Sequence, residues 1–414
     1  MNLLSMACRY LRFRWLVTTL TVASIALGAA LVCAVLALRY ESDRALSRDA
    51  GLYDLVVGGK GSPLQLVLAS VYHLDTPPGN LPYSDYERLR RDPRVRWAAP
   101  IGLGDNYRGY RIVGTEPHFF DLTDREDEPF FRIARGRVFD DRFEVVLGSQ
   151  VAKATGLDVG DQFFGTHGLV PVPGGEVHRD FPYQVSGILD TTGTAQDRAI
   201  FATLESVWEI HETEERLHSA IQGNALLGNG SEREASAVLL RLETPGLRLW
   251  MTDEIGDRSD GIAAVPINEI LRFQRGVVGP VQQSLLAIAA AVVMVACLTV
   301  FITLHQAGER RRRDIAILRS LGAVRGEVAA LVFIEGLILT GAGVLVGLLM
   351  GHGGLALASG AIRDATGLVL EPWRIPSVEL SALGGMLACG AIATLFPAIA
   401  CYRRTPIADL QLTD

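Results

Sequence analysis

Cysteine is scarce in this chain of 414 residues, and its longest polar stretch contains none. The five cysteines are Cys8, Cys33, Cys297, Cys389 and Cys401, so none lies between residues 41 and 280. A disulfide framework, or a zinc site built on cysteine pairs, needs several cysteines close together. Both are therefore excluded from that stretch.

The chain also lacks the motif of a nucleotide-hydrolysing protein. A P-loop needs Gly-Lys followed by Ser or Thr, so that backbone amides and the hydroxyl meet phosphate and magnesium. The nearest approach is the loop Gly58–Ser62, where Gly61 follows Lys60. We interpret this loop as a tight turn after a strand. The chain is therefore expected to carry no cofactor and to hydrolyse no ATP on its own.

No catalytic constellation stands out either. The sequence has no nucleophile elbow and no evident grouping of Ser, His and Asp. Catalytic groups are often far apart in sequence, so this observation favours a protein without catalytic residues but does not prove it.

Histidine offers one weak metal-site pattern. The segment His211–His218 departs from the zinc-protease motif, which needs His at i and i+4, because position 215 is Glu. On a helix, His211, Glu215 and His218 would still share one face. A surface metal site is one interpretation, but we favour a solvated charged face and expect no metal ligand. The six histidines between residues 41 and 280 keep metal-linked cargo open as an alternative.

Long hydrophobic runs are what this sequence has in excess. Nearly uncharged blocks cover residues 16–38, 281–305, 328–351 and 380–401. A helix rises about 1.5 Å per residue, so each block can cross a hydrocarbon core about 30 Å thick. Inside a membrane, such a segment satisfies its own backbone only as a helix. The sequence therefore predicts four transmembrane helices.

The first block has two alternative interpretations. A cleaved signal peptide usually has an apolar core of about 7–15 residues, and the run from Leu16 to Leu38 is longer. A lipoprotein signal at Cys33 would need a small residue before it, and Val32 occupies that position. Both observations favour a helix that is retained.

Arginine placement predicts the orientation of the helices. Arginines precede the first block, fill the segment between the second and third, and follow the fourth; they are Arg9, Arg12, Arg14, Arg310, Arg311, Arg312, Arg313, Arg319, Arg325, Arg403 and Arg404. By the positive-inside rule these three segments are cytoplasmic. We expect a bacterial inner-membrane protein with a cytoplasmic N-terminus (1–15), loop (306–327) and tail (402–414). Residues 39–280 would form a periplasmic domain and 352–379 a periplasmic loop.

The stretch 39–280 predicts a mixed domain of helices and strands. Strands are expected at Asp54–Val57, Arg111–Val113, Glu144–Leu147, Tyr183–Leu189, Ala199–Phe201 and Ala237–Leu242. Helices are expected at Tyr83–Arg91 with Ser84 as its cap, Ser149–Thr155, Leu204–Leu217 and Leu247–Glu254, and a flexible link at Gly223–Gly230. This uneven alternation predicts an α+β domain in two lobes. Its excess of acidic residues does not suit nucleic acid.

Two features of the third hydrophobic block invite a functional interpretation. Gly343, Gly347 and Gly351 recur every four residues, which makes a flat strip that lets another helix approach closely. Glu335 is costly inside a bilayer. We favour a structural pairing of Glu335 with a basic residue at the cytoplasmic rim, and a role in a gate is the alternative.

The segment between the second and third blocks is the most informative. Four arginines stand at the membrane edge, followed by an amphipathic stretch and a glycine stop. Ile315, Leu318 and Gly322 share one helical face, so a short cytoplasmic helix is predicted between two spans. The alternative is that this segment only sets the orientation of the helices in the membrane. That role would require the arginines but not the amphipathic helix that follows them.

This segment resembles the cytoplasmic loop of the FtsX-like permeases, the group that includes MacB and the lipoprotein-releasing Lol permeases. Such proteins show a run like E-R-R-x-E-I-[AG]-[IV]-L-R-A-[LI]-G-A, against Glu309–Ala323 here. The resemblance continues through Phe333–Gly336 and closes with Pro397–Leu410. In the stretch 39–280, the segments Val145–Ala152, Gly156–Asp161, Tyr183–Asp190 and Asp197–Phe201 resemble a MacB-like periplasmic core.

The resemblance implies one helix, a periplasmic domain and then three helices. It also implies a permease dimer over a cytoplasmic ABC ATPase, with a homodimer expected and a heterodimer as the alternative, and a periplasmic or outer-membrane partner as an open option. The residues that would contact the ATPase are Glu309, Arg310, Arg311, Arg312, Arg313, Asp314, Ile315, Leu318, Arg319, Leu321 and Gly322. Since no ATPase domain precedes the first helix, the resemblance implies that the ATPase is a separate chain, which would carry the ATP and magnesium.

Three functions are compatible with these expectations. The leading one is an ABC transporter permease that passes ATP-driven motion to its periplasmic domain and moves a substrate outside the inner membrane. The first alternative is an FtsX-like regulator of periplasmic enzymes that moves no cargo. A sensor is the third, and the short cytoplasmic segments argue against it because they leave no room for an output domain.

Overall fold

The computed structural model describes residues 3–124, 126–169, 177–221, 233–258, 261–310, 317, 324–366 and 370–403. The chain divides into two compact units, which we call the helical unit and the sheet unit. The helical unit comprises Met1–Ser42, Val277–Ala361 and Leu370–Asp414. The sheet unit comprises Asp43–Gly276 and Ile362–Val369.

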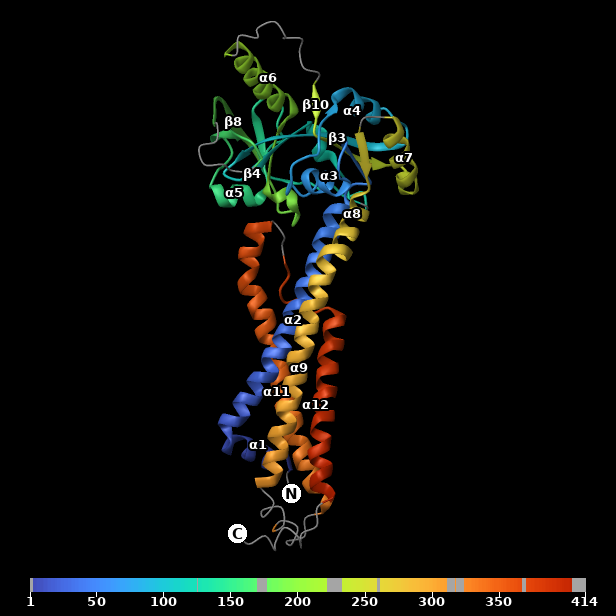
Figure 1. Cartoon of the computed structure of the whole chain (residues 1–414). Coiled ribbons are helices and arrows are strands. Elements are labelled where there is room, and N and C mark those ends of the chain that lie inside the picture. The colour runs from blue at the N-terminus through green and yellow to red at the C-terminus, as the bar shows by residue number, and fades with distance from the viewer. Residues whose placement is uncertain are drawn as a thin grey trace. The chain divides into compact units, whose positions relative to one another are not determined.

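Within the described residues, four helices are long and apolar enough to cross a membrane (Figure 1). They are α2 (Trp15–Gly51), α9 (Gly279–Arg310), α11 (Arg325–Thr366) and α12 (Ser377–Arg403), and the short α1 (Leu3–Phe13) precedes them. The four transmembrane helices predicted from hydropathy are confirmed. Their inward faces share one apolar core, which includes Ile25, Ala296, Val332 and Met386.

The helices continue past the apolar blocks. Helix α2 runs on to Gly51, and α9 follows α8 (Pro266–Phe273) and a π-helical turn (Gln274–Val278). Helix α11 extends to Thr366, so the first part of the predicted periplasmic loop 352–379 is helical, and its place outside the membrane stays a prediction. Hydropathy marks the part of a helix that suits lipid, whereas the helix itself continues until a breaker intervenes. Here Pro372 and Pro376 stand before α12.

The sheet unit is built on one mixed sheet with strand order β12-β1-β11-β3-β4-β9-β6-β8-β5, and β7 pairs with β3 and β8. The strands are β1 (Leu55–Gly59), β3 (Val95–Tyr107), β4 (Tyr110–Thr115), β5 (Ile133–Gly136), β6 (Glu144–Leu147), β7 (Gln162–His167), β8 (Val177–Leu189), β9 (Ala199–Thr203), β11 (Ala237–Leu242) and β12 (Gly261–Ala264). Strands β2 (Leu81–Pro82) and β10 (Glu234–Ala235) form a separate pair. The pairs β4–β9 and β6–β8 are parallel, and the others are antiparallel.

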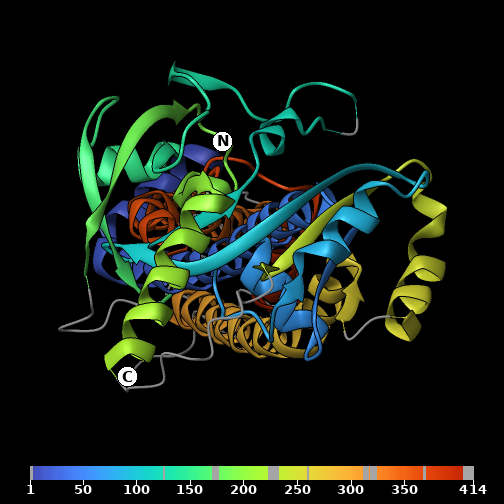
Figure 2. The same cartoon turned by 90° about the horizontal axis from the view of Figure 1, so that it is seen from above.

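Strand β3 joins the two halves of this sheet (cyan in Figure 2). Its first part, Val95–Ile101, pairs with β11, and its second part, Gly102–Tyr107, pairs with β4. Helices α3 (Pro63–Ser70), α4 (Tyr83–Arg90) and α7 (Arg248–Arg258) accompany the first half. Helices α5 (Ser149–Thr155) and α6 (Leu204–Ile221) accompany the second. The predicted α+β domain in two lobes is confirmed.

Several expected elements of the sheet unit appear with the expected bounds, and others differ. Strands β6 and β11 and helix α5 match. The cap assigned to Ser84 is wrong, because α4 begins at Tyr83 after Pro82 and has no side-chain cap. The turn expected at Gly58–Pro63 is shorter than predicted, because β1 includes Gly58 and Gly59 and α3 begins at Pro63. The link expected at Gly223–Gly230 lies outside the described residues.

Candidate functional site

The glycine strip of α11 lies against α2. A Cβ atom added at Gly343 would come within 2.5 Å of Ile25 Cβ, and one added at Gly351 within 2.8 Å of Cys33 Cβ. At Gly347 it would meet Ala29 Cβ and come within 2.6 Å of the Ala26 carbonyl oxygen. Real Cβ atoms do not approach other atoms this closely. The three glycines therefore let the backbones of the two helices approach to a distance that no larger residue permits.

A second close approach joins α11 to α12, and it is reciprocal. A Cβ added at Gly336 of α11 would lie 2.7 Å from Thr394 Cβ of α12. One added at Gly390 of α12 would lie 2.5 Å from Thr340 Oγ1 of α11. Each threonine hydroxyl donates within its own helix, Thr340 to the Gly336 carbonyl at 2.9 Å and Thr394 to the Ala391 carbonyl at 2.8 Å. This contact was not predicted from the sequence, although both helices carry Gly and Thr four residues apart.

Three buried acidic residues of the described chain lie in the helical unit, namely Glu41, Glu335 and Glu379. Glu335, whose relative exposure is 2%, directly precedes Gly336 at the contact with α12. Its pairing with a basic residue at the rim stays a prediction. Oε1 of Glu379, at the start of α12, lies 2.7 Å from Nε2 of His352, and Nδ1 of that ring donates to the Pro372 carbonyl. This second pair was not predicted from the sequence.

The ATPase-contact segment falls largely outside the described residues. Glu309 and Arg310 end helix α9. The other residues of the proposed contact lie outside the described part of the chain, namely Arg311, Arg312, Arg313, Asp314, Ile315, Leu318, Arg319, Leu321 and Gly322. Their role stays a prediction.

The sheet unit contains a cluster of one carboxylate and three imidazoles, which we call the Asp105 cluster: Asp105, His167, His178 and His211. Asp105 lies on β3, where the register with β4 shifts between Leu103 and Asp105. On its other side β3 pairs with β7, so that Asp105 stands opposite His167. A bulge of this kind re-aims the side chain next to it.

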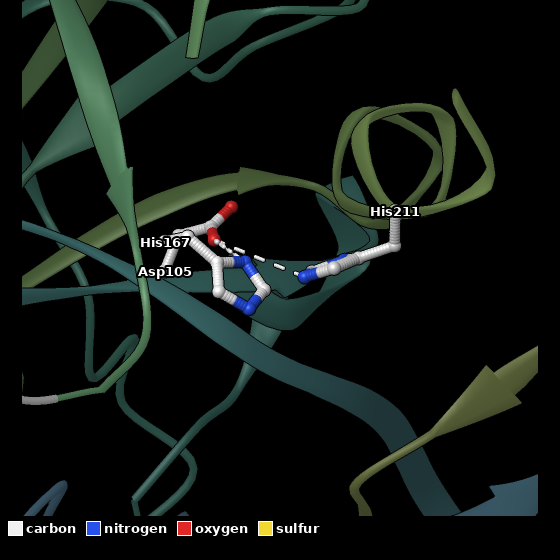
Figure 3. A group of neighbouring side chains, drawn as sticks. All are labelled: Asp105, His167 and His211. Carbon is white, nitrogen blue, oxygen red and sulfur yellow. Dashed lines mark ion pairs between the residues drawn. The ribbon is translucent and has the colours of Figure 1, made fainter. Parts of the chain in front are cut away.

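The rings of the cluster surround one carboxylate oxygen. From Asp105 Oδ1, the distance is 3.1 Å to Nε2 of His178, 3.7 Å to Nδ1 of His167 and 3.8 Å to Nε2 of His211. Figure 3 shows His167 coming from a strand and His211 from helix α6, both directed toward Asp105. The ligand atoms of Asp105, His167 and His211 all lie within 4.8 Å of one another.

Glycine allows His211 to lie against the sheet. A Cβ added at Gly104 would come within 2.7 Å of His211 Nε2. The other ring nitrogen, Nδ1, lies 2.9 Å from the Val207 carbonyl oxygen. A carbonyl only accepts, so His211 donates from Nδ1, and in a neutral ring Nε2 then presents its lone pair toward Asp105.

Burial makes this arrangement costly unless something compensates the carboxylate. Asp105 is 1% exposed, and Oδ2 is buried without a hydrogen-bond partner in the described part of the chain. The hydroxyl of the buried Tyr183 is likewise without a partner there. Burial, and then the negative charge of Asp105, raises the pKa of Tyr183. A buried carboxylate normally pairs with a cation or coordinates a metal.

The metal-site pattern found in the sequence is only partly related to this cluster. Of His211, Glu215 and His218, the first belongs to the cluster, and the side chains of the other two lie outside the described residues. The partners of His211 come from β3 and β7, which sequence spacing on one helix does not reveal. A cavity of about 400 Å³ lies beside His211 and is lined among others by Trp208, Glu212 and Arg233.

A second carboxylate–imidazole pair in the sheet unit is fully partnered. Glu116 accepts from Tyr83, from Tyr86 at 3.0 Å and from His118 Nδ1 at 3.1 Å. Burial alone would raise the pKa of Glu116, but these hydrogen bonds outweigh it and lower the pKa to about 2. Burial would lower the pKa of His118, yet its bonds to Glu116 and to the Ala98 carbonyl raise it. We interpret this pair as structural.

Two families match this chain over most of its length. Residues 18–241 match the MacB-like periplasmic core domain, and residues 286–406 match the FtsX-like permease C-terminal domain. The chain belongs to the FtsX-like permeases with a MacB-like periplasmic core. The predicted family is thus confirmed, and its four apolar helices make the chain a multi-pass bacterial membrane protein.

Individual relatives of this permease are distant or cover little of it. The uncharacterized ABC transporter permease YknZ of Bacillus subtilis (strain 168) is 38% identical over 93 residues, which are 21% of this chain and 23% of YknZ. The periplasmic region of MacB from Actinobacillus actinomycetemcomitans is 11% identical, with a TM-score of 0.34, over 54% of this chain and 92% of that structure. The extracellular domain of YknZ from Gram-positive bacteria is also 11% identical, with a TM-score of 0.29, over 50% of this chain and 98% of that structure.

Proposed function

We propose that this permease receives ATP-driven motion from a separate cytoplasmic ATPase and passes it to the domain between α2 and α9, which acts on a substrate outside the inner membrane. The observation that carries the proposal is the match of residues 286–406 to the FtsX-like permease domain, because it includes α11, α12 and the segment between α9 and α11. Hydrolysis takes place on the partner, and this chain carries no catalytic residue.

Close helix packing supports transmission of motion rather than passage through the chain. Helix α11 contacts α2 through glycines and α12 through reciprocal Gly–Thr contacts. Packed helices with small residues at their contacts move together because separation would lose the van der Waals contacts that hold them. A push on the segment before α11 would therefore reach α2 and α12 as well.

The positive-inside rule supports the orientation in this proposal. It places the termini and the arginine-rich segment 309–325 in the cytoplasm, where the ATPase works, and residues 39–280 in the periplasm. A dimer of permeases, one over each ATPase subunit, is part of the proposal.

The proposal is tested by purifying the tagged permease gently from its native host and identifying what accompanies it. We expect a small ATPase, lost when Arg311→Glu and Leu318→Asp are combined. The matched control is Arg325→Glu, which removes one positive charge outside the patterned stretch and should retain the ATPase. A folded permease that never recovers an ATPase would refute the proposal and favour an FtsX-like regulator. In that case a periplasmic hydrolase or its activator is the expected companion.

A further inference from the structure

We propose that the Asp105 cluster is a binding site for a divalent first-row metal ion, with zinc as the ion that its ligands suit best. Asp105, His167 and His211 are the ligands, and His178 positions Asp105. The proposal rests on the geometry of the sheet unit alone and does not depend on coupling to an ATPase.

Two groups of the cluster that can accept hydrogen bonds face each other without a donor from the described residues between them. The lone pair on His211 Nε2 and the carboxylate of Asp105 face each other at 3.8 Å. Two acceptors at this separation repel each other unless a cation or a proton lies between them. Since Asp105 is 1% exposed and its described ionic partners are histidines, bulk water does not screen this charge.

The distances between the ligand atoms are close to those found around a zinc ion. Tetrahedral zinc holds nitrogen and oxygen at about 2.0–2.2 Å, so neighbouring ligand atoms lie about 3.3–3.5 Å apart. Asp105 Oδ1 is 3.7 Å from His167 Nδ1 and 3.8 Å from His211 Nε2. A movement of about half an ångström would bring each nitrogen to coordination distance from Asp105 Oδ1. The three ligand atoms lie within 4.8 Å of one another, and both histidines are partly exposed, which permits their rings to move closer together.

The ligands also make the hydrogen bonds that usually orient the ligands of a metal ion. A metal-bound imidazole usually donates its other N–H to a carbonyl or carboxylate, and His211 donates from Nδ1 to the Val207 carbonyl. Ligating carboxylates are themselves hydrogen-bonded, and His178 Nε2 lies 3.1 Å from Asp105 Oδ1. The polar partners that a metal site needs are thus already in place.

The ligand set indicates the class of ion. Two imidazoles and one carboxylate are borderline ligands that suit zinc and its neighbours, whereas calcium and magnesium prefer oxygen alone. Three protein ligands leave a tetrahedral ion one open position. His211 also lines the cavity of about 400 Å³, so water or a donor group of a bound molecule could complete the coordination there.

Zinc binding is measured on the full-length permease, freed of metal with a chelator and purified in detergent. Zinc chloride is titrated against a fluorescent zinc indicator, and cobalt chloride is added separately to read the visible spectrum of tetrahedral coordination. We expect one ion per chain. His167→Ala and His211→Ala should each remove this binding, and His178→Gln should weaken it about 10- to 100-fold, as expected for a residue that positions a ligand.

The control is His305→Ala, which removes an exposed histidine of α9 in the helical unit, outside the sheet unit that holds the cluster. It should bind zinc as the wild type does. His167 is half exposed, so its replacement leaves the fold intact, and circular dichroism of the metal-free variants checks this. His167→Ala therefore remains informative even if Asp105→Asn fails to fold.

Two results would overturn the proposal. One is a wild-type protein that binds zinc no more tightly than the variant lacking both His167 and His211. The other is loss of zinc binding in His305→Ala with binding retained in His167→Ala, which would place the ion in the helical unit. If only a proton, and no metal ion, lies between the Asp105 carboxylate and His211 Nε2, the first result is expected.

Discussion

The contact between α2 and α11 allows a sharp test of how the helical unit is held together. We consider Gly347→Ala, which adds one Cβ at the centre of the glycine strip. Gly341→Ala is the matched control, because an added Cβ at Gly341 has nothing within 4 Å. Both changes lie on the same helix and carry the same gain in helix propensity. The difference in stability between the two variants therefore reports the packing of α11 against α2 alone.

The size of the effect follows from the geometry. An added Cβ at Gly347 would lie 2.6 Å from the Ala26 carbonyl oxygen, and ordinary contact begins at 3.4 Å. The helices must therefore separate by about 0.8–1.0 Å, since neither this oxygen nor Ala29 Cβ, at 2.4 Å, can move by a change of rotamer. A gap of about 0.5–1 Å removes roughly a quarter to a half of the dispersion energy of each contact between the two helices. Overpacking of this kind costs about 1–3 kcal/mol.

Cys33 provides the assay, because it is buried where α2 meets Gly351. Modification of Cys33 by N-ethylmaleimide in detergent, followed by mass spectrometry, reports how often the two helices separate. A cost of about 1–3 kcal/mol predicts labelling about 5- to 150-fold faster in Gly347→Ala than in Gly341→Ala. Equal labelling rates in the two variants would refute the close approach of α2 and α11.

Two further predictions concern the sheet unit and use urea unfolding in detergent. Glu116→Gln should lower the free energy of unfolding by about 2 kcal/mol, since it leaves His118 without its charged partner. The pKa of Glu116 is lowered from 4.5 to about 2, so its contribution is present above pH 4.5 and lost as pH falls toward 2. The variant should lack that slope. The pKa of His118 is raised, so its contribution is present below about pH 6.5 and lost as pH rises through the folded pKa. Asp54→Asn should lower the free energy of unfolding by about 3 kcal/mol, because it breaks the ion pair in which Arg248 lies 2.7 Å from the buried Asp54 carboxylate. Arg248→Lys keeps the positive charge and should lose less. An equal loss would contradict an explanation based on charge.

The membrane helices could be predicted from the sequence because the physical cause is local. A run of about 20 apolar residues suits lipid whatever surrounds it. The ends of the helices could not be predicted in the same way. Residues 352–366 are compatible with a helix or a loop, and hydropathy does not distinguish the two.

Strand β3 shows why part of the sheet unit was missed. Pro100, Gly102 and Gly104 interrupt the alternation along Val95–Tyr107, and such residues normally indicate a turn. In the structure, Pro100 pairs with Val238 on β11, and the two glycines lie where side chains of α6 approach the strand. Tertiary contacts, not local preference, explain these residues.

The Asp105 cluster was beyond prediction for a related reason. Its members lie on β3, β7, β8 and α6, and their sequence separations follow no ligand spacing. Only the pairing of β3 with β7 brings Asp105 opposite His167. The histidine content of the stretch indicated that metal chemistry was open, but it did not indicate which rings would meet.

The reciprocal contact between α11 and α12 allows a rescue experiment that the glycine strip does not. Gly336→Ala would place a Cβ against Thr394 Cγ2 and 2.7 Å from Thr394 Cβ, so it should destabilise the helical unit. Thr394→Ser removes the first obstacle and keeps the hydroxyl, so the double variant should recover part of the loss. At Gly347 the obstacle includes the Ala26 carbonyl, and Thr394→Ser should recover nothing there. Rescue of both glycine variants would mean that Thr394→Ser stabilises the unit in general, and the specific contact between Gly336 and Thr394 would then lose its support.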